Sequence, residues 1–260
     1  MRKKHAVQKL IDSKDQNNHI FIRASIAMAV YNGERFIAEQ INSILPMLSL
    51  EDEIIISYDD SQDQTWNIIS EYADTDNRIR IFRNEYSRGV EGNFTNAVMR
   101  CNGQYILLCD QDDVWIDGKI QRVVDHFELT GADLIIHDGY DVNMNLEIQG
   151  DSLFEKGHIS TSPFRNYIRG TCWGCCMAFR ADIRKELCPF PSRVAHDLWT
   201  VILCGAKRAA LLPRKLTLHR LHGSNVTPLH RQALPVILSD RARLLFYLVK
   251  RRFGLMLRRV

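Results

Sequence analysis

The sequence predicts an α/β fold: a mixed, mainly parallel sheet of the Rossmann-like type, flanked by helices. Short apolar runs typical of buried strands alternate with segments in which apolar residues recur at helical spacing. The chain has 260 residues, of which 45% are hydrophobic and 25% charged, as expected for one α/β domain with a sizeable core. The formal net charge of +3 is too small to indicate nucleic acid binding.

The first half of the chain accounts for the strand and helix pattern. Strands are expected at residues 24–30, 53–57, 79–82, 105–109 and 133–137. One helix is expected from Ile37 to Leu48, and a second one after a capping box formed by Ser61 and Gln64. Two more are expected at residues 93–99 and from Ile116 to Phe127. Strands that alternate with helices favour βαβ units. Residues 141–170 lack this pattern and are predicted to be irregular.

The two ends of the chain differ from the middle. Residues 1–23 form a polar N-terminal extension without the apolar segment of a secretion signal. Residues 231–260 are predicted to form a basic amphipathic helix, because residues 241–260 hold seven Lys or Arg and no Asp or Glu. Such a helix favours peripheral contact with anionic lipid at the inner face of the cell membrane. A helix packed on the domain, or a dimer contact, is the alternative.

The seven cysteines are odd in number and follow no secretion signal, so they are interpreted as reduced thiols of a cytoplasmic protein. Cys172, Cys175 and Cys176 are close in sequence, but no second pair follows at the spacing of a zinc site. We therefore interpret them as structural.

Polar clusters follow three of the predicted strands: Tyr31-Asn32, Asp59-Asp60, and the turn from Asp110 to Asp113. In parallel sheets, ligands bind beyond the carboxyl ends of the strands, so the three clusters are expected at one edge. Neighbouring carboxylates such as Asp112 and Asp113 repel each other unless a cation lies between them, and oxygen ligands suit Mg²⁺ or Mn²⁺. The turn is therefore a candidate site for a divalent metal.

Three motifs together resemble glycosyltransferase family 2, whose members have the GT-A fold. They are Ser-Ile-Ala-Met-Ala-Val-Tyr-Asn-Gly at 25–33, Ile-Ile-Ile-Ser-Tyr-Asp-Asp-Ser-Gln-Asp-Gln-Thr at 54–65 and Cys-Asp-Gln-Asp-Asp-Val-Trp at 109–115. The last has the form common in bacterial rhamnosyltransferase-like members. The resemblance covers roughly residues 24–226. It implies a GT-A domain at 24–230, with a nucleotide-binding half at 24–115 and an acceptor-binding half at 116–230.

The resemblance also implies roles for individual residues. Asp197 is expected to be the catalytic base, with its neighbour His196 as the second choice. The metal ligands are expected to be Asp113, Asp112 and His222. Nucleotide-binding residues are expected to be Ala29, Tyr31, Asn32, Asp59, Arg88, Asn93, Asp110, Gln111 and Asp112. Acceptor-binding residues are expected to be Trp173, Gly174 and His196.

The second motif departs from the family, which usually has Asp-Asp-Gly-Ser there. This chain has Tyr58 in place of the first Asp and Asp60 in place of the Gly, which changes the loop backbone and leaves the preferred nucleotide open. The resemblance implies an inverting, metal-dependent transfer from a dTDP- or UDP-sugar, with rhamnose a candidate sugar. The acceptor would be a glycan or lipid-linked molecule of bacterial surface polysaccharide synthesis.

Two other functions stay open at this point. A nucleotidyltransferase would use similar carboxylates and a metal, but it would need a Gly-rich, basic loop after the first strand, and Tyr31 to Glu34 is not one. A non-catalytic subunit that binds a nucleotide sugar is compatible with the altered loop at Asp59 and Asp60.

Overall fold

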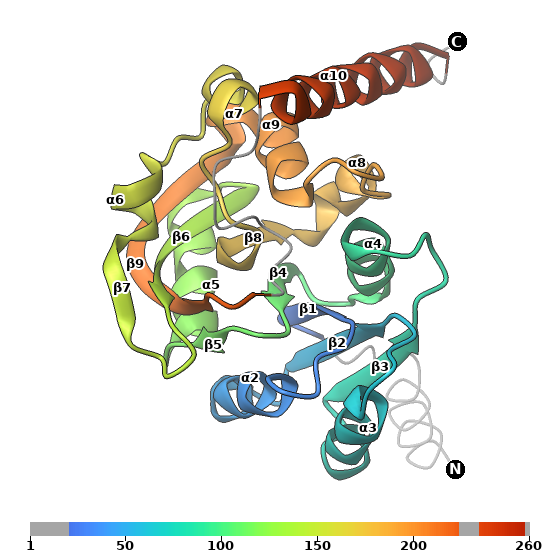
Figure 1. Cartoon of the computed structure of the whole chain (residues 1–260), viewed down its shortest axis with the longest axis vertical. Helices are drawn as coiled ribbons and strands as arrows, with labels where there is room; N and C mark the ends of the chain where they lie inside the picture. The colour runs from blue at the N-terminus through green and yellow to red at the C-terminus, as the bar shows by residue number, and fades with distance from the viewer. Residues whose placement is uncertain (1–20, 224–233, 258–260) are drawn as a thin grey trace, which may run out of the picture.

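A computed structural model of the chain describes residues 21–223 and 234–257 (Figure 1). The strands are β1 (Ala24–Val30), β2 (Asp52–Tyr58), β3 (Ile79–Arg83), β4 (Tyr105–Asp110), β5 (Val114–Trp115), β6 (Leu134–Val142), β7 (Ile148–Ser152), β8 (Met177–Arg180) and β9 (Ala209–Arg220). The α-helices are α2 (Ile37–Ile44), α3 (Thr65–Thr75), α4 (Val90–Arg100), α5 (Lys119–Thr130), α6 (Leu153–Gly157), α7 (Pro163–Arg169), α8 (Arg184–Leu187), α9 (His196–Arg208) and α10 (Leu234–Leu257). Short 3₁₀ turns lie at Leu45–Met47, Gly174–Cys176 and Ala181–Ile183.

The strands form one mixed sheet in the order β3-β2-β1-β4-β8-β6-β9-β5, with β7 paired to β6. Pairing is parallel across β3-β2-β1-β4 and between β6 and β9, and β8 joins these two groups by antiparallel pairing with both β4 and β6. The predicted α/β class and mixed sheet are confirmed. The parallel first group brings the carboxyl ends of β1, β2 and β4 to one edge, as the sequence predicted.

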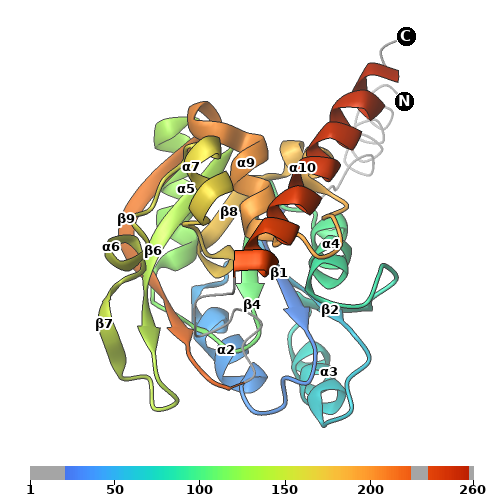
Figure 2. The ribbon, with the colours of Figure 1, turned by 45° about the horizontal axis from the view of Figure 1, so that its top comes forward.

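The sheet is buried on both faces because helices cover both (Figures 1 and 2). In β2 all seven residues are buried. Ile54 and Ile56 pack in one apolar cluster with the side chains of α2 and α5, while Ile55, which points to the other face, packs with those of α4 and α9. This two-sided burial explains why the strand contains consecutive isoleucines rather than an alternating pattern.

The predicted capping box at Ser61 and Gln64 is wrong. Helix α3 begins at Thr65, and the side chain of its N-cap, Gln64, makes no capping hydrogen bond. Instead the backbone N–H of Thr65 donates to Oδ1 of Asp63 at 3.1 Å, and the hydroxyl of Ser61 accepts from the backbone N–H of Asn32 at 2.9 Å. Asp63 therefore caps the helix in place of the predicted pair, and Ser61 holds two loops together.

The region predicted to be irregular, 141–170, contains β7, α6 and α7. Its elements are short, so hydrophobic periodicity could not reveal them. Helix α6 nonetheless has a capping box, in which Ser152 accepts from the N–H of Glu155 and the Glu155 side chain accepts from the N–H of Ser152. Two other helices begin away from their predicted starts, α4 at Val90 and α5 at Lys119.

The predicted C-terminal helix is present as α10, which lies against α7 and α9 and projects beyond the rest of the domain (Figures 1 and 2). In the described part of the chain, no helix combines the length and apolarity that crossing a membrane requires. The predicted extension at residues 1–20 lies outside the described residues, as do residues 224–233 and 258–260.

Candidate active site

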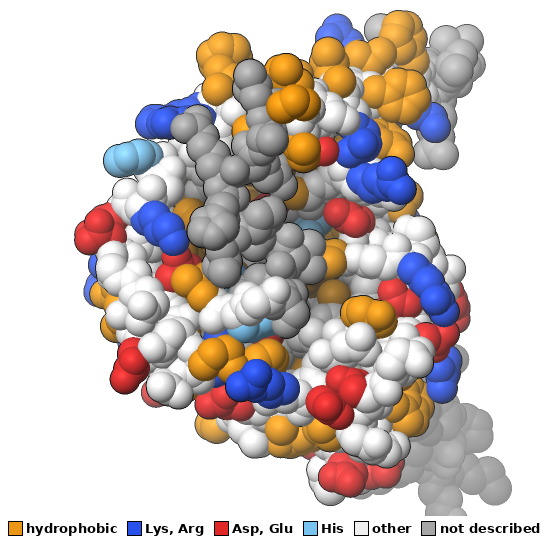
Figure 3. All heavy atoms as spheres, in the orientation of Figure 1, with side chains coloured by type: hydrophobic (Ala, Val, Ile, Leu, Met, Phe, Trp, Pro, Cys, Tyr) orange, Lys and Arg blue, Asp and Glu red, His pale blue; other side chains and the backbone are white. Residues whose placement is uncertain are grey.

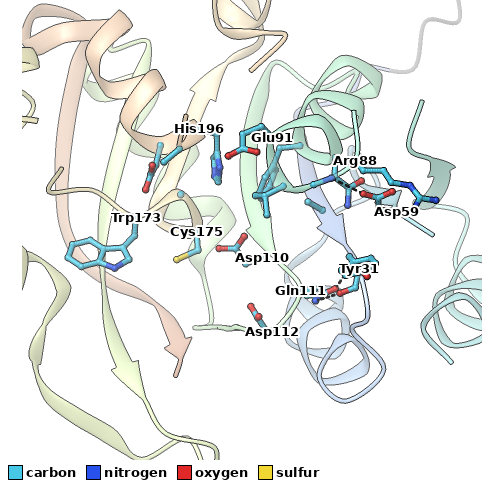
Figure 4. Close-up of a pocket in the computed structure, with 18 of the residues that line it drawn as sticks. Tyr31, Asp59, Arg88, Glu91, Asp110, Gln111, Asp112, Trp173, Cys175 and His196 are labelled. Atoms are coloured by element: carbon cyan, nitrogen blue, oxygen red, sulfur yellow. Dashed lines mark hydrogen bonds between the residues drawn. The ribbon is translucent and has the colours of Figure 1, made fainter. Parts of the chain in front are cut away.

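A cavity of about 590 Å³ lies at the carboxyl ends of β1, β2 and β4 (Figure 4). It is lined on one side by residues of the predicted nucleotide-binding half, called the nucleotide side, and on the other by residues from the start of α9 and the turn before β8, called the acceptor side after their predicted role. The residues predicted for the site that line it are Ala29, Tyr31, Asp59, Arg88, Asn93, Asp110, Gln111, Asp112, Trp173, Gly174, His196 and Asp197. Asn32, Asp113 and His222 do not line the cavity, and each is described below.

On the nucleotide side, Gln111 holds the backbone of Tyr31. Its Nε2 donates to the carbonyl oxygen of Tyr31 at 2.8 Å, and its Oε1 accepts from the Tyr31 N–H at 2.9 Å. A Cβ on Gly33 would lie 2.4 Å from Oε1 of Gln111, so a larger residue there would displace the Gln111 amide from these hydrogen bonds. The Tyr31 ring itself is 52% exposed and free to pack against a flat ligand.

Asp59 and Asn93 also bind backbone at the cavity wall. Oδ2 of Asp59 accepts from the N–H of Gly89 at 3.0 Å, and Gly89 has φ 103°, in the region that favours glycine. Nδ2 of Asn93 donates to the carbonyl oxygen of Val30 at 3.0 Å, which leaves its buried Oδ1 without a partner among the described residues. The end of β1 and the start of α4 are thereby fixed relative to each other.

Two residues predicted to bind the nucleotide, Asn32 and Arg88, do not hold backbone at the cavity wall. The side chain of Asn32 accepts from the N–H of Gln62 at 2.9 Å, so it serves the contact between two loops and does not face the cavity. Arg88 lines the cavity with a side chain that is 81% exposed, and its guanidinium pairs with Asp60 at 3.3 Å. Asp60, which replaces the family's usual glycine, thus orients a cation at the cavity mouth.

The acidic turn brings together three groups that could hold a metal ion. Ligand atoms of Asp110, Asp113 and Cys175 all lie within 4.8 Å of one another. Asp113 is fully buried, and its Oδ2 has no partner among the described residues, while Oδ1 accepts from the N–H of Arg220 at 3.1 Å. Burial raises the pKa of Asp113 to about 6. The pKa of Asp110 is also raised, by burial and by the neighbouring charges of Asp113 and Asp112. An orphaned buried carboxylate oxygen beside a second carboxylate fits a divalent cation.

The other two predicted metal ligands pair with each other. Nε2 of His222 lies 3.0 Å from Oδ2 of Asp112, and the His222 ring stacks on Phe36 with ring centroids 4.8 Å apart. Asp112 lines the cavity, and His222 lies behind it. The structure therefore separates the predicted set: Asp113 lies with Asp110 and Cys175, whereas Asp112 lies with His222.

On the acceptor side, Asp197 lies in the first turn of α9. Its Oδ1 accepts from the N–H of Leu198 at 2.6 Å. Burial raises the pKa of Asp197 to about 6, while the charge of Arg241 opposes this rise. A carboxylate with a pKa near neutrality, on a cavity wall, is suited to general base catalysis.

His196, the residue before it, is held by packing. Its ring lies 4.4 Å from that of Phe94, and burial lowers its pKa to about 4. A Cβ on Gly174 would lie 2.3 Å from Nε2 of His196, so the predicted acceptor residue Gly174 provides the space that the imidazole occupies. Trp173 packs against the backbone of Gly157 as well as lining the cavity.

Comparison with known proteins bears directly on this arrangement. The profile of Glycosyl transferase family 2 matches residues 25–188, which is more than half of the chain. The chain belongs to glycosyl transferase family 2. It is 31% identical over 183 residues to the Escherichia coli protein WfgD, a UDP-Glc:alpha-D-GlcNAc-diphosphoundecaprenol beta-1,3-glucosyltransferase, covering 69% of both chains. It is 28% identical to WfaP, which carries the same description in the same organism, over 78% of this chain and 79% of WfaP.

Solved structures support the GT-A fold of this glycosyltransferase. The Staphylococcus aureus protein TarS, in complex with UDP-GlcNAc, superposes with a TM-score of 0.65 at 18% identity, over 78% of this chain and 60% of TarS. The Pyrobaculum calidifontis mannosyltransferase PcManGT, in complex with GDP-Man and Mn²⁺, gives 0.59 at 16% identity, over 78% of this chain and 58% of that one. Family membership favours glycosyl transfer over the nucleotidyl transfer and non-catalytic binding that the sequence left open.

Several residues that line the cavity of this glycosyltransferase were not predicted from the sequence, and His219 is one of them. Its Nδ1 lies 2.7 Å from Oδ1 of Asp141, which Lys156 also contacts. Burial alone would lower the pKa of His219, but the hydrogen bond to Asp141 and the charges of Asp113 and Asp141 raise it to about 9. The imidazolium therefore faces the acidic turn.

Lys119 is a second missed residue, and it is fully buried. Its Nζ donates to the carbonyl oxygen of Cys175 at 3.0 Å and to the hydroxyl of Thr217 at 2.8 Å, and it lies 3.8 Å from the centre of the Trp115 ring. Lys119 thus positions the backbone that carries the Cys175 thiol. A lysine at the start of a helix gives no sequence signal for such a role.

Proposed function

We propose that this glycosyltransferase transfers a sugar, with inversion, from a UDP-sugar to a lipid-linked acceptor of bacterial surface glycan synthesis. The observation that carries the proposal is the cavity itself. It joins Tyr31 and Asp59 on the nucleotide side to Asp197 on the acceptor side, across the acidic turn (Figure 4). Such a cavity can hold a nucleotide at one end and an attacking hydroxyl at the other.

The donor assignment rests on relatives. WfgD and WfaP are described as using UDP-Glc with a diphosphoundecaprenol-linked GlcNAc acceptor, and a Campylobacter jejuni relative, 26% identical over 55% of this chain, is also a glucosyltransferase that acts on a PP-undecaprenol-linked glycan. UDP-Glc is therefore our first choice. The dTDP-rhamnose donor expected from the acidic turn is the alternative, and it forms one arm of the test.

The residues of the acidic turn fit a divalent cation, Mg²⁺ or Mn²⁺, held by the carboxylates of Asp113 and Asp110, with Asp112 and the Cys175 thiol beside them. Such a cation, when bound, supplies positive charge to the departing diphosphate. His219, which also lines the cavity, is held beside the turn by its contact with Asp141, and this contact raises the pKa of the imidazole.

The transfer is a single displacement. The acceptor hydroxyl oxygen forms a bond to the anomeric carbon, while the bond from that carbon to the diphosphate oxygen breaks and UDP leaves. The hydroxyl proton passes to the carboxylate of Asp197. Because one attack replaces one leaving group, the configuration at the anomeric carbon inverts.

The test uses Asp197→Asn, with Asp74→Asn as the matched control. Asp74 is exposed on α3, away from the cavity, so the same chemical change there leaves activity unchanged. With UDP-Glc, dTDP-rhamnose and other nucleotide sugars, and a synthetic GlcNAc-diphospholipid acceptor, we expect release of nucleoside diphosphate by the parent protein. Asp197→Asn should lower kcat by about 10²–10⁴-fold with little change in donor affinity.

The proposal would be contradicted in either of two ways. One is that a folded Asp197→Asn protein keeps the parent rate. The other is that no nucleotide sugar supports transfer in the presence of Mg²⁺ or Mn²⁺. Preference for dTDP-rhamnose over UDP-sugars would revise the donor and leave the reaction class intact.

A further inference from the structure

Helix α10 carries an apolar stripe on the side that faces away from the domain. The exposed fractions of its large members are 60% for Leu238, 51% for Leu245, 61% for Phe246, 45% for Val249 and 62% for Phe253. Successive helical residues are offset by about 100°, so these side chains fall within one stripe roughly 100° wide. Exposed apolar residues scattered singly are ordinary, but a continuous stripe indicates a binding surface.

The opposite side of the same helix packs on the domain. Leu244 is fully buried in the apolar cluster that includes Trp199, and the backbone carbonyl of Arg241 accepts from the hydroxyl of Tyr167 at 3.3 Å. The helix is therefore apolar on two opposite sides. The side with Leu244 is apolar because it packs on α7 and α9. The exposed stripe packs on no described part of the domain.

Neighbouring α7 repeats the pattern. Phe164 is 75% exposed and Ile168 is 55% exposed, and they lie one turn apart on one side of that helix. Each is followed by an exposed arginine, Arg165 or Arg169. We call the seven large apolar residues the docking face: Phe164, Ile168, Leu238, Leu245, Phe246, Val249 and Phe253. Figure 3 shows apolar and basic side chains together at the end of the molecule where α7 and α10 lie.

The charges around the docking face determine what it can bind. Lys250 and Arg252 are exposed next to the stripe, on opposite sides of it. The only acidic residue in the described parts of α7 and α10 is Asp240, which already pairs with Arg243 at 2.9 Å. Two copies of this face would therefore bring like charges together, whereas an anionic lipid surface would receive both the cations and the apolar side chains.

We infer that α7 and α10 form an interfacial docking surface for an anionic bilayer, on which the docking face inserts among the lipid headgroups. The helix that carries most of this surface, α10, packs on α9, which begins at the cavity with His196 and Asp197. A membrane-bound protein would thus present its acceptor side near the lipid. This last consequence rests on the proposed lipid-linked acceptor, whereas the docking itself does not.

The experiment is vesicle flotation of the full-length protein without nucleotide or acceptor. Phosphatidylcholine vesicles with and without phosphatidylglycerol serve as the probe. We expect binding to the anionic vesicles, weakened by salt. The triple variant Leu245→Ser, Phe246→Ser, Phe253→Ser should lower the partition coefficient on the order of a hundredfold. Lys250→Gln and Arg252→Gln should each lower it about fivefold.

The matched control is Leu50→Ser with Leu129→Ser, which removes two leucines that are 89% and 81% exposed elsewhere on the surface, and which should leave flotation unchanged. Circular dichroism confirms that the triple variant is folded. Equal flotation of the triple variant and the parent would overturn the inference. So would a parent protein that forms dimers lost in the triple variant and does not float. Flotation without sugar transfer would contradict the proposed function alone.

Discussion

The two sides of the cavity are built differently. On the nucleotide side, polar side chains bind the protein's own backbone: Gln111 holds Tyr31, and Asp59 holds Gly89. On the acceptor side, His196 and Asp197 are held mainly by burial, which moves the pKa of the first down to about 4 and of the second up to about 6. The nucleotide side is thus a preformed shape, and the acceptor side is a set of ionisable groups tuned by their surroundings.

This contrast fits the two tasks that we propose for the two sides. A nucleotide must be bound in one orientation before any bond changes, which favours rigid backbone held by hydrogen bonds. A hydroxyl must lose its proton, which favours a base whose pKa lies near the working pH. Substitutions on the nucleotide side should therefore change donor affinity, and those on the acceptor side should change the rate.

The largest effect is expected at the acidic turn between the two sides. Asp113→Asn keeps an oxygen to accept from the N–H of Arg220 but removes the charge that faces the metal position. We expect kcat/KM to fall about a thousandfold, because several kcal/mol of charge stabilisation is lost. Asp117→Asn, which is exposed in the next loop after β5, is the control. Calorimetric titration with Mn²⁺ gives an independent measurement, and undiminished Mn²⁺ affinity in Asp113→Asn would refute this role.

A medium effect is expected from pH at saturating metal, where a bound cation keeps Asp113 ionised and the acceptor side sets the pH dependence. Asp197 acts as a base only when ionised, and its pKa is raised to about 6 by burial, against the opposing charge of Arg241. Below pH 6 the carboxylate is protonated, so kcat should fall about tenfold per pH unit, and above it kcat should level off. A pH–rate profile at saturating donor checks this. A flat profile from pH 5 to 7, with the protein folded throughout, would assign the base to another group.

The smallest effect is expected on the nucleotide side. Gln111→Met fills the same space but removes both hydrogen bonds to the backbone of Tyr31. We expect KM for the donor to rise about five- to tenfold with kcat nearly unchanged, since two exposed hydrogen bonds worth about 0.5–0.7 kcal/mol each are lost. Initial-rate kinetics separate the two constants. A drop in kcat alone would remove the distinction between the two sides.

The fold and the strand-end clusters could be predicted from sequence because both depend on local patterns. Consecutive buried residues, as at Ile54 to Ile56, indicate a strand covered on both faces, and parallel strands bring their ends together. The roles proposed for individual residues, including Asp197 and Asp113, remain predictions. What the pattern could not supply were partnerships across long separations, such as Lys119 with Cys175 or His219 with Asp141. Such contacts form only when strands that are far apart in the sequence pair in the folded sheet.

The capping error at Ser61 has the same origin. The motif was locally valid, but Ser61 is used by Asn32, which lies 29 residues earlier. A side chain that can satisfy a helix or a tertiary contact cannot be assigned from its neighbours alone.

Arg220 joins four parts of the molecule. It donates from its backbone to Asp113 and from its guanidinium to the carbonyl oxygens of Asp112 and Met144 and to the carboxylate of Glu39. The acidic turn is therefore completed only by the end of β9. During synthesis the ribosome must release more than a hundred further residues after Asp113 before the turn acquires its partner. The family match ends at residue 188. A fragment that stopped there would contain Asp112, Asp113 and the nucleotide side of the cavity, but it would lack Arg220, which holds the two aspartates in place.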